Sequence, residues 1–317
     1  MTNDLVAPPK KEFQTFHDFP LVSDLDTLAA DIAILGIPFG DPYSMAEVSN
    51  DQSTAPTHIR RHCERALRGL DRYDFDIGGT LLDGRDIRVV DCGDVKAAAK
   101  DVAGNHNRSE KVVRKILDAG VMPIILGGDH AIPIPVFRAL EGHGPITLIQ
   151  IDAHLDWRDR FHGVDHGLSS VIRRAAEHEH IQDIWQIGLR AAGSGRPEEH
   201  QAALDYGSNL VSDIELQDVG MQAILDRIPD GGQYYLTIDA DGVDPTIMPA
   251  VAGPAPGGVT YPQMRTLING LAKKGRVVGM DIVEITPARD VNGITAITAG
   301  RFVCMMIGAA VRARYFD

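Results

Sequence analysis

The stretch that decides the fold is TLIQIDAHLD, residues 147–156. Its first half, Thr147–Ile151, is nearly all apolar, which is typical of a strand that a parallel sheet covers on both faces. Asp152, His154 and Asp156 follow at once, and in extended backbone such alternate residues point to one side. We therefore expect a buried strand that ends in three potential metal ligands on one face. A solvated turn is the alternative interpretation.

Similar short runs recur along the chain and alternate with amphipathic stretches. The segment Ser109–Ala119 indicates a helix that ends at Gly120, and another helix begins after Thr260 and ends at Gly275. A last apolar helix is expected at about residues 296–314. This alternation predicts an α/β fold with a mainly parallel, doubly wound sheet, whose ligands lie at the carboxyl ends of the strands. The other expected strands are Asp31–Ile37, Ile87–Asp91, Met122–Leu126, Ile184–Leu189, Tyr234–Ile238 and Arg276–Ile282.

Three further polar clusters lie at or just beyond the ends of expected strands. Gly127–His130 places a histidine over the sheet edge, although this segment alone is more typical of a structural turn. By the same alternation Asp239 and Asp241 lie together, and paired carboxylates repel each other unless a cation or a proton offsets the charge. Asp244, which precedes a proline, favours a turn over a ligand. Glu284 is expected to contact substrate, with an exposed surface position as the alternative.

Together these clusters offer two histidines and four aspartates as ligands, and no cysteine. Carboxylates with imidazole suit Mn²⁺ and other borderline metals, whereas structural zinc usually recruits thiolate. Four carboxylate charges balance two divalent cations, which favours a two-metal centre that activates water near neutral pH. The candidate ligands are His130, Asp152, His154, Asp156, Asp239 and Asp241. The residues thus predict a metal-dependent hydrolase.

Composition and charge exclude several partners. A formal net charge of −13 argues against nucleic acid and anionic membranes. No apolar run approaches the roughly 18 residues that a membrane span needs, and the opening stretch MTNDLVAPPKKEF resembles no signal peptide, so we expect a cytoplasmic protein. The three cysteines, Cys63, Cys92 and Cys304, are too scattered for a disulfide framework and are expected to be buried free thiols.

Three motifs in a fixed order carry a family resemblance. Gly-Gly-Asp-His, Asp-Ala-His-x-Asp and Asp-x-Asp-x-x-Asp-Pro occur in this order within a stretch of about residues 30–314 that resembles the ureohydrolases, which include arginase, agmatinase, guanidinobutyrase and guanidinopropionase. The resemblance implies a three-layer α/β/α sandwich and the hydrolysis of a guanidino compound to urea and an amine. It also implies two divalent ions, manganese first and nickel as the alternative. A homo-oligomer, trimer or hexamer, is expected, with a paralogous subunit as a further option.

The resemblance also assigns roles to individual residues. One ion would be bound by His130, Asp152, Asp156 and Asp239, and the other by Asp152, His154, Asp239 and Asp241, so that Asp152 and Asp239 bridge. His166, after Asp165, matches a proton shuttle that helps the amine to leave, and His162 is a competing match. Glu284 matches the acid that binds the guanidinium group, since a planar pair of N–H donors suits a carboxylate.

Two stretches depart from the family pattern. Residues 248–258 read MPAVAGPAPGG where relatives usually carry Thr-Gly-Thr-Pro, and residues 41–53 replace an early motif rich in glycine and arginine. Arg158 and Arg160 would repel the second positive charge of agmatine, unless they face solvent. We therefore expect a divergent, agmatinase-like member whose substrate is guanidine, an alkylguanidine, a guanidino acid or a biguanide. A formimino hydrolase resembling formiminoglutamase, or a metal-binding subunit without activity, are the alternatives.

The domain organisation is predicted to be simple. No repeat, low-complexity segment or convincing linker interrupts residues 29–317, which we interpret as one arginase-like catalytic domain. Residues 1–28 contain three prolines and indicate an irregular N-terminal arm, with a frayed tail as the alternative.

Overall fold

The fold is built on one eight-stranded sheet. A computed structural model describes residues 5–6, 14–40, 51–192 and 195–317. The strands have the order β2-β1-β3-β8-β7-β4-β5-β6, and every neighbouring pair is parallel. Their bounds are β1 Ile32–Ile37, β2 Val89–Asp94, β3 Met122–Gly127, β4 Ile146–Ile151, β5 Ile181–Leu189, β6 Asn209–Ser212, β7 Gln233–Asp239 and β8 Arg276–Val283.

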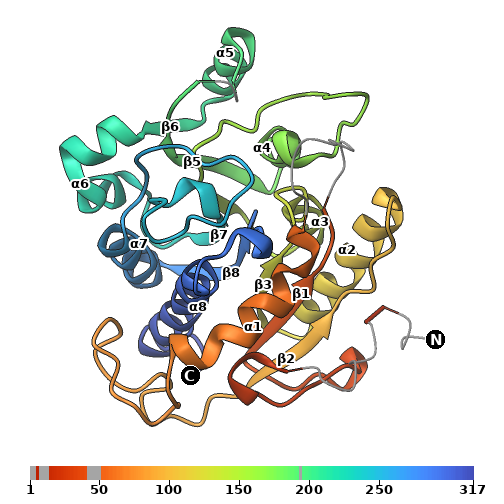
Figure 1. Cartoon of the computed structure of the whole chain (residues 1–317), viewed down its shortest axis with the longest axis vertical. Helices are drawn as coiled ribbons and strands as arrows, with labels where there is room; N and C mark the ends of the chain where they lie inside the picture. The colour runs from red at the N-terminus through yellow and green to blue at the C-terminus, as the bar shows by residue number, and fades with distance from the viewer. Residues whose placement is uncertain (1–4, 7–13, 41–50, 193–194) are drawn as a thin grey trace.

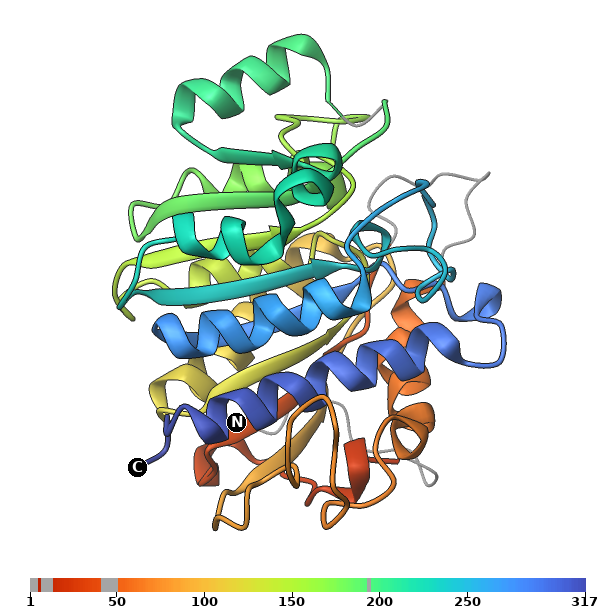
Figure 2. The ribbon, with the colours of Figure 1, turned by 90° about the vertical axis from the view of Figure 1, so that its left-hand side faces the viewer.

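Helices cover both faces of this sheet (Figures 1 and 2). On one face α1, α6, α7 and α8 contribute to one apolar core, and on the other α2, α3, α4 and α5 contribute to a second. The predicted three-layer α/β/α sandwich with a parallel, doubly wound sheet is therefore confirmed. The helix bounds are α1 Ala55–Ala66, α2 Val102–Asp118, α3 Pro133–Ala139, α4 Val171–Ala175, α5 Pro197–Tyr206, α6 Asp213–Arg227, α7 Tyr261–Lys274 and α8 Ile294–Arg312.

The burial of both faces explains why the strands are so apolar. In β1, Ile32 and Ile34 pack into the core under α1 and α8, whereas Ala33 and Leu35 pack into the core under α2 and α3. A strand covered on both sides has no solvent-facing positions for polar residues, so alternation is lost and a continuous apolar run remains. The seven expected strands are confirmed for this reason.

Three expectations need correction. The helix expected from Ser109 begins at Val102, because the side chain of Asp101 accepts a hydrogen bond from the N–H of Gly104 and caps an earlier turn. Strand β6 was not predicted, since it is short and only partly buried. Helix α8 is long and apolar enough to cross a membrane, contrary to our interpretation of the sequence, but 83% of its apolar window is buried against neighbours that include α1 and α7.

The segment before β1 packs beside β2. The backbone N–H of buried Phe16 donates to Asp91 Oδ2 at 2.8 Å, and the backbone of Asp91 bonds to Pro20 and Val22. These contacts fasten residues 16–22 to the sheet. The division into an arm over residues 1–28 and a single domain over residues 29–317 stays a prediction, and residues 1–4 and 7–13 lie outside the described part of the chain.

The strand order decides where the site forms. Strands β3, β8, β7 and β4 are consecutive in the sheet, and all run in the same direction. The polar clusters that follow these strands therefore meet at one edge, although they lie far apart in the sequence. The close approach of Gly242 to the backbone of Asp152 brings two of the clusters together, because a side chain at Gly242 would occupy the same space.

Gly242→Ala should destabilise the protein by about 2–3 kcal/mol, because its Cβ would lie 2.4 Å from the backbone N of Asp152, and backbone cannot move aside cheaply. The matched control is Gly232→Ala, whose Cβ would meet only the ring of Tyr234 at 3.6 Å and should change stability by less than about 1 kcal/mol. Urea denaturation of the metal-free proteins measures both. Equal unfolding midpoints for the two variants would contradict the close approach.

Candidate metal centre

One imidazole nitrogen lies among three carboxylates. His130 Nδ1 is 3.1 Å from Oδ2 of Asp152, of Asp156 and of Asp239. This nitrogen is buried and makes no hydrogen bond with any described residue. Ligands in neighbouring positions around one ion are separated by roughly 3 Å, because metal–ligand bonds measure about 2.0–2.2 Å. The arrangement therefore fits a bound cation.

A second group of ligands lies beside the first. His154 Nδ1 is 3.1 Å from Asp241 Oδ2 and 3.5 Å from Asp152 Oδ1. Asp152 thus faces His130 with one oxygen and His154 with the other. Potential ligand atoms lie within 4.8 Å of one another in two sets, namely His130, Asp152 and Asp239, and Asp152, His154 and Asp241. The geometry fits two ions that share Asp152.

The electrostatics of the cluster favour bound positive charge. Burial, together with the charge on Asp152, raises the pKa of Asp156 to about 7. Burial also raises the pKa of Asp239 and of Asp241, and each is near another carboxylate. Burial opposes a charge on His154, but Asp152 and Asp241 outweigh it and raise the pKa of its imidazole to about 12. Without a cation, the cluster therefore retains protons.

A buried hydrogen-bond chain orients His130. Its Nε2 lies 3.1 Å from Thr237 Oγ1, and the Thr237 hydroxyl donates to Asp281 Oδ1 at 2.7 Å. Tyr235 donates to the other oxygen of Asp281 at 2.8 Å, and burial raises the pKa of Asp281 to about 6. A hydroxyl has one hydrogen, so Thr237 accepts from Nε2–H and leaves Nδ1 facing the carboxylates, where its lone pair would bind a cation that replaces the proton.

A second buried chain holds Asp152. Gln150 Nε2 donates to Asp152 Oδ2 at 2.6 Å, and Gln186 Nε2 donates to Gln150 Oε1 at 2.7 Å. Ser208 in turn donates to Gln186 Oε1 at 3.1 Å. Sequence reasoning gave no role to these residues or to Thr237. For Gln150, Gln186 and Thr237 the available signal was a polar residue within an apolar strand, since a fully buried polar group needs a partner.

Glu284 lies inside the site and is only 5% exposed, so the surface alternative for it is wrong. Its Oε1 accepts a hydrogen bond from the backbone N–H of His130 at 2.7 Å, and its Oε2 accepts from Gln52 Nε2 at 3.1 Å. Burial raises the pKa of Glu284. Gln52 was missed by sequence reasoning. It is the second-last residue of the divergent stretch 41–53, of which residues 41–50 lie outside the described part of the chain.

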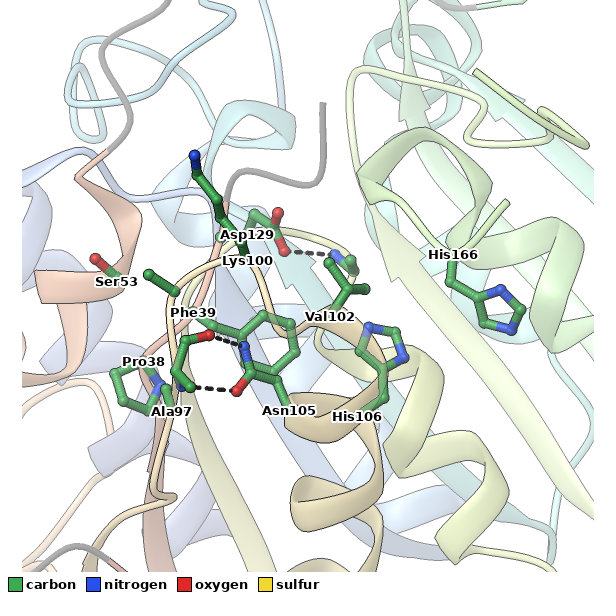
Figure 3. A pocket seen from close by; sticks show the side chains of 14 residues that line it. Pro38, Phe39, Ser53, Ala97, Lys100, Val102, Asn105, His106, Asp129 and His166 are labelled. Carbon is green, nitrogen blue, oxygen red and sulfur yellow. Dashed lines mark hydrogen bonds between the residues drawn. The ribbon is translucent and has the colours of Figure 1, made fainter. Parts of the chain in front are cut away.

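The loop after β4 places the two competing histidines differently. His166 is partly buried, and its Nδ1 lies 2.7 Å from Asp165 Oδ1, a hydrogen bond that lowers the pKa of Asp165. His162 is exposed and packs its ring on Phe161. Arg160 lies 3.4 Å from the other oxygen of Asp165. His166 also lines a cavity next to the metal centre (Figure 3).

Turns, and not an extended strand, present the candidate ligands after β4 and β7. Strand β4 ends at Ile151, and Asp156 has a left-handed φ of 51°, so Asp152, His154 and Asp156 do not lie on one extended strand. Likewise Asp241 lies in a 3-10 turn, where its N–H donates to Asp239 Oδ1 at 2.8 Å. Turns that the aspartate side chains stabilise bring these ligands together, and not the alternation of side chains along an extended strand.

Two smaller expectations are confirmed. Asp244 Oδ1 accepts a hydrogen bond from the N–H of Thr246 at 2.8 Å, as expected of a turn former. All three cysteines, Cys63, Cys92 and Cys304, are buried free thiols.

The parallel sheet carries a histidine–aspartate cluster at its carboxyl edge, which makes the chain an α/β protein with a candidate metal centre. The pattern of the arginase family matches residues 30–308, and the chain belongs to this family. It is therefore an enzyme, a hydrolase of the ureohydrolase group, and the predicted family is confirmed.

Individual relatives match over much or most of the chain. Guanidinopropionase of Pseudomonas aeruginosa is 29% identical, with 98% of this chain and 99% of that protein covered. Mitochondrial agmatinase of Gallus gallus is 31% identical, with 74% of this chain and 70% of that protein covered. Among solved structures, proclavaminate amidinohydrolase of Streptomyces clavuligerus has a TM-score of 0.83 at 24% identity, with 97% and 100% covered. Agmatine ureohydrolase of Thermoplasma volcanium has a TM-score of 0.74 at 28% identity, with 92% and 94% covered.

Metal should stabilise the protein more at high pH than at low pH. Folding raises the pKa of Asp156 from 3.8 to about 7, so the stability that its proton contributes is complete below pH 4 and is lost as the pH rises through 7. The raised pKa of Asp239 and of His154 acts in the same direction. Bound cations should replace these protons, and the gain in melting temperature on adding Mn²⁺ should be larger at pH 8 than at pH 5.5.

Thermal unfolding of chelator-treated and Mn²⁺-reconstituted protein at both pH values provides the measurement. An equal gain at the two pH values, or no gain at either, would show that the buried carboxylates do not bind the ions.

Proposed function

We propose that this chain hydrolyses a carbon–nitrogen bond of a guanidino compound and releases urea and an amine. The observation that carries the proposal is the position of His130 Nδ1, which has no hydrogen-bond partner among the described residues and faces three carboxylates. Asp152 links this group of ligands to a second group around His154. A neutral molecule would not compensate so much buried negative charge, whereas a pair of divalent cations would.

The ligand set supports a two-metal centre. The first ion would be held by His130, Asp152, Asp156 and Asp239, and the second by Asp152, His154 and Asp241, with Asp239 as a further shared ligand. Mn²⁺ is the expected metal and Ni²⁺ the alternative, since imidazole with carboxylate suits such ions. When bound, a pair of this kind activates water as a nucleophile near neutral pH.

Two protein groups would act on the substrate directly. The Glu284 carboxylate would accept the planar N–H groups of the guanidinium, next to the Gln52 amide that already donates to it. His166 would give a proton to the departing amine, with Asp165 holding its imidazole in position. His166 is preferred to His162 because it lines the cavity, whereas His162 is exposed. A nitrogen leaves poorly unless it is protonated, so the reaction requires such a general acid.

The names of the relatives support the proposed substrate class. The similar proteins include a guanidinopropionase, a guanidinobutyrase and agmatinases, all named for guanidino compounds. The two arginines of the loop after β4 do not line the described cavity: Arg158 packs over Phe161, and Arg160 lies beside Asp165. We propose a divergent agmatinase-like enzyme for guanidine, an alkylguanidine, a guanidino acid or a biguanide. We further propose a cytoplasmic homo-oligomer, trimer or hexamer.

Incubation of the purified chain with Mn²⁺ or Ni²⁺ and a panel of guanidine, methylguanidine, agmatine and 4-guanidinobutanoate should release urea from at least one compound. A colorimetric urea assay and detection of the amine provide the measurement. Formamide or ammonia from a formimino substrate, without urea from the panel, would indicate the alternative formimino hydrolase. No product from any compound would overturn the proposal and favour a non-catalytic subunit.

Substitutions at two positions should separate metal binding from proton transfer. Asp239→Asn should lose bound metal and activity together, because it removes a charge that faces the cluster. His166→Ala should keep the metal and lower kcat by about 10²–10⁴, the usual contribution of a general acid. His162→Ala is the matched control and should leave kcat within about threefold. Metal analysis and steady-state kinetics test these outcomes, and a larger loss in the control would assign the shuttle to His162.

A further inference from the structure

A small cavity beside α2 is lined by residues that include His106 and His166 (Figure 3). Its volume is about 230 Å³, which is below the roughly 300–1,000 Å³ of pockets for drug-sized ligands. Asp129 and Ala131, the two neighbours of the candidate ligand His130, form part of its wall. Ser53, which follows the Glu284 partner Gln52, forms another part. The cavity is therefore placed to receive the part of a substrate that extends beyond the guanidino group.

One polar side chain of this cavity is left without a partner. His106, on α2, is only 3% exposed, and its Nε2 makes no hydrogen bond with any residue that the structure describes. Its ring lies between Phe39 and His166, with centroid separations of 5.5 Å and 5.9 Å (Figure 3). Leaving a buried nitrogen without a partner is unfavourable, so a ligand that pairs with His106 Nε2 would be stabilised.

The imidazole of His106 is neutral at physiological pH. Burial lowers the pKa of His106 to about 3, and the positive charge of Arg138 acts in the same direction. A neutral imidazole accepts a hydrogen bond at one nitrogen and donates at the other, so it can pair with a hydroxyl or an amide. It offers no charge to a carboxylate or to an ammonium group.

The rest of the described wall carries little net charge. Its charged side chains are Asp129 and Lys100, one of each sign, and most of the remaining wall is apolar or small. Asp129 Oδ1 already accepts a hydrogen bond from the N–H of Ala131 at 3.0 Å. In Figure 3 the Lys100 ammonium extends away from the His106 ring. A charged substituent would lose its hydration in this cavity, and no described side chain of opposite charge is placed to pair with it. The cavity therefore favours an uncharged substituent.

We propose that His106 determines substrate specificity, by forming a hydrogen bond from its buried imidazole to an uncharged polar substituent, a hydroxyl or an amide, of the guanidino substrate. The inference rests on the proposed function, because it takes the guanidino group to lie at the metal centre. It adds that the substituent is small, since about 230 Å³ is below the roughly 300–1,000 Å³ of pockets for drug-sized ligands. His106 makes no contact with the reacting atoms and is a specificity residue.

Matched pairs of ligands test the inference. The pairs are 3-guanidinopropanamide with 3-guanidinopropanoate, and 4-guanidinobutanamide with 4-guanidinobutanoate, which differ within each pair only in the charge of the end group. Guanidine itself has no substituent and serves as the reference. The variants are His106→Phe, which keeps a ring but has no nitrogen, and His106→Gln, which restores a polar group near the position of Nε2. Binding to the metal-loaded full chain is measured by titration calorimetry, and KM and kcat by urea release.

One amide should bind to the wild-type protein about tenfold more tightly than its carboxylate partner. His106→Phe should weaken amide binding and raise its KM about five- to tenfold, with kcat and the KM for guanidine changed less than twofold, and His106→Gln should recover part of the loss. An equal loss for guanidine and the amide, an unchanged amide affinity, or no binding of either amide would overturn the inference. Tight amide binding without urea release would instead refute the proposed hydrolysis while leaving the His106 contact intact.

Discussion

Four aspartate carboxylates are buried around two imidazoles at the carboxyl edge of the sheet, and their repulsion must be offset by positive charge. Burial and mutual proximity raise the pKa of Asp156, Asp239 and Asp241, and the neighbouring carboxylates raise that of His130 and His154 against the effect of burial. The folded chain thus accepts protons or cations at one place. The strand order, the tight turns and the buried hydrogen-bond chains all maintain this concentration of charge.

The supporting residues are polar positions within strands that are otherwise apolar. Thr237 and Asp281 fix the ring of His130, and Gln150 and Gln186 hold Asp152. Such buried chains cost desolvation and are favourable only when every member has a partner. They limit the freedom of the ligands before any ion binds, and a pre-organised site loses less entropy on binding. Asp156 and Glu284 both have left-handed backbone, so the site also stores some conformational strain.

The substrate side of the site is built differently from the metal side. Gln52, His106 and His166 come from loops or a helix that lie outside the strands of the sheet, and each contacts a neighbour from another segment. Loops tolerate change because few core contacts depend on them, so specificity varies there while the sheet edge keeps its ligands. The departure of this chain from its family pattern at residues 248–258 falls in such a connection, between β7 and α7.

The sequence alone determined the strands, the layer architecture and the ligand types, because burial on both faces and clustered carboxylates leave strong local patterns. It did not reveal β6, the early start of α2, or the roles of Thr237 and Gln52, whose signals are weak. Only the tertiary structure decided that the clusters after β3, β8, β7 and β4 meet, since strand order is a long-range property. It also decided how Asp241 reaches Asp152, through a 3-10 turn packed at Gly242, and that His106 lies buried beside His166.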